Sequence, residues 1–77
     1  MYAVIQINTV NPYRFPKARL VRKFQSREMA FNWLLDDQLP IILANGYSVV
    51  YESPTQGGYI LMLTSNSEDT TIQIMEV

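Results

Sequence analysis

The chain has 77 residues, a formal net charge of −1, and neither cysteine nor histidine. Disulfides, thiolate metal sites and histidine-based proton transfer are therefore excluded. Apolar residues make up 48% of the chain and charged residues 17%, below the roughly 25% that is usual. Since a small domain has a large surface for its volume, we expect residues 1–77 to form a single domain with apolar surface that a partner covers.

Charge is segregated along the chain. All six basic residues lie between Arg14 and Arg27, and all seven acidic residues lie between Glu28 and Glu76. A near-neutral net charge therefore conceals a polarised sequence. Such polarity bears on association with partners rather than on fold.

The first third of the chain predicts two strands joined by a loop. Residues 2–9 and 17–24 alternate apolar and polar side chains, the pattern of half-buried strands. Two prolines in the intervening stretch 11–16 indicate a loop. In the second strand, simple alternation places Leu20 and Phe24 on the same face.

A helical region follows. Ser26 is a good N-cap, and a helix is expected over about 27–35. Pro40 lacks an N–H and interrupts the pattern, which leaves two alternatives. Either one helix is kinked, or two helices follow each other, with Asp36 or Asp37 capping the second.

Gly46 is expected to end the helical region in a left-handed conformation. Three further strands are predicted over 47–52, 59–64 and 70–77, with a hairpin loop at 53–58. The order ββαβββ predicts an α+β domain. Its five-stranded sheet would be mostly antiparallel, with one kinked helix or two short helices packed on one face.

Two groups of side chains are distinguished on the helix. A broad apolar stripe should pack on the sheet: Ala30, Phe31, Leu34 and Leu35. A second group is predicted to form an apolar protein-partner contact with an acidic rim: Met29, Trp33, Asp36 and Asp37. The alternative is that the kink, or the loop at 11–16, folds over Met29 and Trp33.

One helical region covers one side of a five-stranded sheet and leaves the other bare. The alternation assigns Tyr2, Val4 and Val21 to the bare side, with part of the strand at 47–52. A bare apolar face of this kind is a binding surface, and pairing into a homodimer is the simplest way to cover it.

The basic stretch combines cations with aromatic side chains and is the predicted electrostatic partner site: Tyr13, Arg14, Phe15, Lys17, Arg19, Arg22 and Lys23. Three interpretations remain open. The cations could protect an edge strand from pairing, bind an acidic protein, or bind a nucleic acid. A sequence pI of about 5.1 disfavours nucleic acid, because its binders are usually basic.

Nothing in the sequence predicts an enzyme, a cofactor site or a metal site. The acid pairs at 36–37 and 68–69 could be viewed as Mg²⁺ ligands or an acid–base pair. Cap and turn roles explain them more simply. The stretch Gln56-Gly57-Gly58 is a hairpin signal rather than a phosphate-binding loop.

The expected function is a non-enzymatic protein-binding module of inhibitor or adaptor type, acting as a homodimer; a small nucleic-acid-binding module using residues 14–27 is the alternative. In size, lack of cysteine and histidine, and charge polarity, the chain is similar to the tiny non-enzymatic proteins that phages and mobile elements encode to block host machinery. The sequence carries no signal-peptide pattern and no apolar run long enough for a membrane span, so we expect a cytoplasmic location and no membrane partner.

Overall fold

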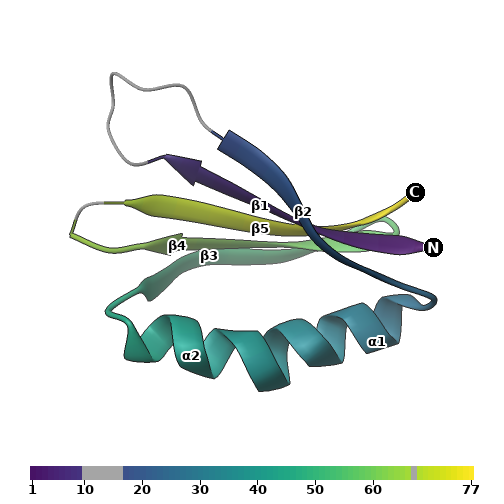
Figure 1. The fold of residues 1–77 in the computed structure, drawn as a ribbon, viewed down its shortest axis with the longest axis horizontal. Helices are drawn as coiled ribbons and strands as arrows, with labels where there is room; N and C mark the ends of the chain where they lie inside the picture. The colour runs from purple at the N-terminus through teal and green to yellow at the C-terminus, as the bar shows by residue number, and fades with distance from the viewer. Residues whose placement is uncertain (10–16, 67) are drawn as a thin grey trace.

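The computed structural model describes residues 1–9, 17–66 and 68–77. All adjacent strands are antiparallel, in the sheet order β2-β1-β5-β4-β3, and the helix lies along one face of the sheet (Figure 1). The predicted α+β architecture with order ββαβββ is thus confirmed. In chain order the elements are β1 (Tyr2–Thr9), β2 (Lys17–Phe24), α1 (Arg27–Asn32), η1 (Trp33–Gln38), α2 (Leu39–Ala44), β3 (Ser48–Thr55), β4 (Gly58–Thr64) and β5 (Asp69–Glu76).

The helical region is one joined helix in which η1 is a π-helical segment between α1 and α2. It begins as predicted, since Ser26 Oγ accepts a hydrogen bond of 3.2 Å from the Met29 N–H. The backbone N–H of Leu39 donates to the carbonyl of Leu34, five residues earlier. Pro40 follows immediately. We attribute the wider π turn to this proline, whose ring would meet the carbonyl four residues earlier in a regular α-helix.

The prediction that Asp36 or Asp37 caps a second helix is wrong. The chain continues from η1 into α2 without leaving helical dihedrals, and the residue before α2, Gln38, makes no capping hydrogen bond with its side chain. Because no helix starts there, no orphan N–H groups need a carboxylate. Within the described residues, no helix is long and apolar enough to cross a membrane.

The core lies between the helix and the sheet. The predicted stripe is confirmed, since Ala30 and Leu34 are fully buried and Phe31 and Leu35 pack against the core. The Phe31 ring meets the Tyr59 ring edge-on, with centroids 5.0 Å apart. The buried cluster consists of Val4, Phe24, Ala30, Leu34, Tyr59, Leu61, Leu63, Ile72 and Ile74.

The predicted facing of β1 is wrong. Val4 belongs to the buried core and Tyr2 packs against it, so these side chains face the helix. Strand alternation then places Ala3, Ile5 and Ile7 on the bare face. Both faces of β1 are apolar enough to be buried, so the alternation alone did not reveal which one meets the helix.

β2 contains a bulge that simple alternation did not predict. Val4 pairs with Arg22 while Ile5 pairs with Leu20, so that Val21 has no opposite residue. The extra residue shifts the alternation, and Leu20 and Phe24 lie on opposite faces rather than on the same one. As a consequence, Arg22 faces the helix side.

Candidate interaction surfaces

The sheet face turned away from the helix carries a broad apolar surface, which we term the open face. Strand pairing places on it Ala3, Ile5, Ile7, Leu20, Tyr51, Ile60, Met62, Thr71, Gln73 and Met75, of which Ala3 is already buried, with Ser48, Ser53 and Thr64 toward its margin. Leu20 and Tyr51 are 54% and 52% exposed, and Met62 and Met75 are 39% and 36% exposed. In Figure 1 no described segment lies over this face.

Charge on the open face is confined to its ends. Among the described residues, pairing places two charged side chains there, Lys23 and Asp69. Lys23 lies beside Ala3 at one end of the strands, whereas Asp69 lies beside Thr64 at the other. The interior of the face is therefore neutral, like the charge-depleted core of a protein interface.

The basic side chains that the structure describes form no ion pair with a carboxylate. Arg19 donates to Gln6 Oε1 at 3.2 Å, and Arg27 donates twice to the Gly58 carbonyl, at 3.1 and 3.3 Å. These acceptors are neutral and leave the positive charge uncompensated. The described cations are Arg19, Arg22, Lys23 and Arg27.

Arg22 is held over two aromatic rings. Its guanidinium carbon lies 5.1 Å from the centroid of Phe24 and 5.7 Å from that of Trp33. The two rings contact each other, with centroids 5.4 Å apart. Stacking of this kind orients the guanidinium plane while leaving its N–H groups available to an acceptor.

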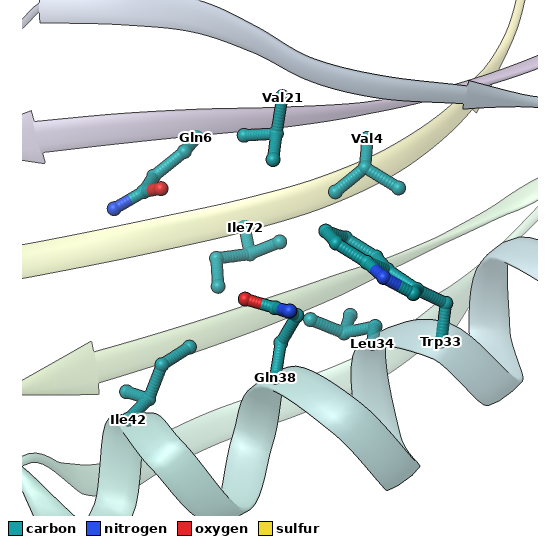
Figure 2. A pocket seen from close by; sticks show the side chains of 8 residues that line it. All are labelled: Val4, Gln6, Val21, Trp33, Leu34, Gln38, Ile42 and Ile72. Carbon is teal, nitrogen blue, oxygen red and sulfur yellow. The ribbon is translucent and has the colours of Figure 1, made fainter.

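A small cleft opens between the helix and strands β1 and β2 (Figure 2). Figure 2 shows its apolar base and the two amide side chains, Gln6 and Gln38, that reach into it from opposite sides. A cavity volume of about 30 Å³ admits one or two water molecules but no cofactor. The lining residues are Val4, Gln6, Val21, Trp33, Leu34, Gln38, Ile42 and Ile72.

The structure does not bring the predicted helix contact together as one exposed group. Met29, Asp36 and Asp37 are exposed. Trp33 is half-buried, lines the cleft and packs on Phe24, so it faces the sheet side. Phe24 of β2 thus packs on Trp33, while Met29 is exposed; the loop at 11–16, the predicted alternative cover, lies outside the described residues.

The basic stretch is described only in part. Tyr13, Arg14 and Phe15 lie outside the described residues, and so does the side chain of Lys17. The side chains that are described divide between the two faces of β2. Arg19 and Arg22 pair with helix-side residues of β1, and Lys23 pairs with Ala3 on the open face.

The acid pair Glu68-Asp69 has the turn role that was predicted for it. Asp69 accepts from Thr64 Oγ1 at 2.7 Å, and Glu68 accepts from Thr70 Oγ1 at 3.1 Å. Asp36 and Asp37 are exposed on the helix. Within the described part of the chain, no group of three acidic side chains is placed to hold a metal ion.

A hydroxyl–carboxylate pair between the buried Tyr59 and the exposed Glu52 links β4 and β3 on the helix side. The Tyr59 hydroxyl donates a hydrogen bond to Glu52 Oε2. Burial, reinforced by the hydrogen bond and charge of Glu52, raises the pKa of Tyr59 from 10.0 to about 12. The hydroxyl therefore keeps its proton in the folded state at pH values where the unfolded chain has lost it.

Folding stability is accordingly expected to fall between pH 10 and about pH 12. Since the pKa is higher in the folded state, the contribution is complete below pH 10 and is lost as the pH rises through the folded value, by on the order of 2 kcal/mol. Urea unfolding between pH 8 and 12 measures this. Tyr59→Phe should flatten the slope, and an equal loss in that variant would contradict the assignment to Tyr59.

Sequence reasoning missed Gln6, Gln38 and most of the open face. Gln38 is the last residue of the π-helical segment, which alters the helical wheel; Pro40 indicated an interruption of the helix but not a widened turn. Comparison with protein-family models, curated proteins and solved structures gave no match. The function is therefore inferred from two surfaces: the open face, and the side of β2 that carries Arg19 and Arg22 beside the cleft, which we term the basic edge.

Proposed function

We propose that this chain is a non-enzymatic protein-binding module that forms a homodimer through the open face. The observation that carries the proposal is the apolar, neutral interior of a complete sheet face with no described segment over it. Burial of such a face is the main favourable contribution to association. A second copy supplies an identical apolar surface, and a two-fold axis makes the face self-complementary.

The size of the face supports this occupant. Five strands of seven or eight residues form the sheet. At strand spacings of about 4.8 Å and rises of about 3.3 Å per residue, the face projects to roughly 600 Å². Protruding side chains raise its accessible area above this projection. A standard stable interface needs about 800 Å² per partner, which the face approaches without any other element.

The dimer is expected to dissociate when a charge is placed within the open face. Met62→Glu would bury an unpaired carboxylate against the second copy, which is strongly unfavourable. We expect the dimer dissociation constant to rise at least about 100-fold, equivalent to about 2.7 kcal/mol. Light scattering behind size exclusion measures the change as a fall from twice the chain mass of 8.9 kDa to a single chain mass.

Met29→Glu is the matched control for this experiment. Met29 is exposed on the helix, outside the open face, and undergoes the same change of side chain. It should leave the mass at the dimer value. If Met29→Glu dissociates the dimer and Met62→Glu does not, the interface lies on the helix; a wild-type monomer at every concentration would refute the dimer.

Dimerisation leaves the basic edge free for an outside partner. We therefore favour an inhibitor or adaptor that works in the cytoplasm by occupying another protein's surface, in the manner of the small phage and mobile-element proteins it is similar to. The unpaired cations and exposed apolar face support binding rather than catalysis. If the basic edge makes the contact, substituting the exposed acids Asp36 and Asp37 should leave binding of the partner protein unchanged.

A further inference from the structure

We propose that an acidic, extended peptide segment of a partner protein adds to the free edge of β2, placing carboxylates on Arg19 and Arg22. The proposal builds on the proposed protein-binding function and names the chemistry of the ligand. In this mode of recognition the backbone supplies hydrogen bonds, and alternate side chains supply specificity.

The sheet has two edges, and they differ in how they would receive a strand. β3 forms one edge and contains Pro54, which has no N–H, and a bulge at Val50. Both features discourage pairing. β2 forms the other edge, contains no proline and is exposed from position 18 to position 23. Its outward N–H and C=O groups are thus the better template for an added strand.

The bulge in β2 gathers charge on one side of that edge. With regular alternation, Arg19 and Arg22 would lie on opposite faces of the strand. The extra residue, Val21, brings Arg22 to the side of Arg19 and of the cleft. Bulges commonly re-aim a side chain in this way beside functional sites.

The two arginines are preorganised for carboxylates. Arg22 is stacked over Phe24 and Trp33, and Arg19 is anchored to the amide oxygen of Gln6. Neither is neutralised by a carboxylate of the described chain. Guanidinium groups held in this way bind carboxylates through two parallel N–H···O hydrogen bonds, in a bidentate geometry. An added strand with acidic residues at alternate positions would direct them to this side.

The cleft provides a specific position for one side chain of the peptide. Gln38 extends its amide into the cleft (Figure 2), and no hydrogen bond to a described residue engages it. A volume of about 30 Å³ fits a carboxylate or methyl head group and excludes a nucleobase. Peptide is favoured over nucleic acid for a further reason: a peptide backbone can form strand-to-strand hydrogen bonds with the free edge of β2, and a sugar–phosphate backbone cannot.

The test is fluorescence anisotropy with the full chain and a labelled peptide of about ten residues alternating Glu and Val. We expect saturable binding that weakens with salt and falls at least about 30-fold in the variant Arg19→Glu/Arg22→Glu. Lys23→Glu is the matched control, because Lys23 lies on the same strand but faces the open side. It makes the same change of charge as each single arginine substitution and should weaken binding less than about threefold.

Three further arms can overturn the proposal. A peptide of the same composition with a central proline should bind at least tenfold more weakly; equal binding excludes strand addition. A single-stranded DNA oligonucleotide of equal charge should bind more weakly than the peptide, and tighter binding would assign the edge to nucleic acid. Equal losses of peptide affinity in Arg22→Glu and Lys23→Glu would mean that net charge, rather than the position of Arg22, controls binding.

Folding and dimerisation are checked apart from peptide binding. Circular dichroism should show that each variant unfolds at the wild-type temperature. If a variant is destabilised, hydrogen exchange on the wild-type protein tests strand addition instead: the peptide should protect the β2 amides. The mass of the protein in solution without peptide tests the homodimer alone. A dimer that fails to bind the peptide refutes strand addition only, and a monomer that binds it refutes the dimer only.

Discussion

Gly58→Ala is expected to destabilise the fold by about 3 kcal/mol or more, because there is no space for a methyl group at this position. A Cβ there would lie 2.0 Å from the backbone carbonyl oxygen of Ile74 and 2.9 Å from Thr55 Oγ1. Ile74 belongs to the central part of the sheet, so its carbonyl cannot move without disturbing the pairing of β4 with β5. The same shift would disturb the Gly58 carbonyl that accepts from Arg27. Urea unfolding monitored by circular dichroism measures the loss.

The adjacent glycine is the control. Gly57 has a φ of 78°, which side-chain-bearing residues rarely adopt, but a Cβ there would meet nothing closer than Glu76 Oε2 at 3.6 Å. Gly57→Ala therefore tests backbone strain without a clash and should cost only about 1 kcal/mol. If Gly58→Ala were no more harmful than Gly57→Ala, the close approach of β4 and β5 at Ile74 would be wrong.

Leu34→Ala should destabilise the protein by about 3–4 kcal/mol, within the range measured for buried leucines. Leu34 is 1% exposed and joins the helix to Val4 and Ile72 at the base of the cleft. A domain of this size has a total stability of roughly 4–11 kcal/mol, so the loss is a large part of it. The measurement is the free energy of unfolding from a denaturant titration.

Leu43→Ala provides the comparison on the same helix. Leu43 is 44% exposed, so shortening it leaves no enclosed cavity and should cost less than about 1 kcal/mol. Comparable losses at the two positions would mean that a second copy covers Leu43, which would place the dimer contact on the helix rather than on the open face. Repeating both titrations at several protein concentrations tests this, because the loss of stability depends on concentration only where the side chain contacts a second copy.

The local elements follow from local patterns. Period-two alternation predicted the strands β1 and β2, and Ser26 predicted where the helix begins. Both signals arise from residues that are close together in the chain. The stripe of Ala30 and Leu34 likewise identified the helix face that packs on the sheet. The interruption at Pro40 was recognised, and of the two predicted arrangements the structure has the single helix, with a π-helical segment before Pro40.

The candidate sites depended much less on local pattern. Cations and aromatic residues were singled out near 14–27, yet the arrangement of Arg22 over Trp33 joins residues from two separate elements. Trp33 was grouped with Met29 from a helical wheel, and the structure separates them because Trp33 packs on Phe24 of β2 while Met29 is exposed.

By itself, the sequence determined the number and order of the elements, the segregation of charge, and an excess of apolar surface for a small domain. These depend on composition and on neighbours along the chain. The tertiary structure alone decided which face of β1 meets the helix, where β2 bulges, and hence which arginines share a side. Those outcomes depend on the register between strands distant in sequence, where a shift of one residue reverses every side chain.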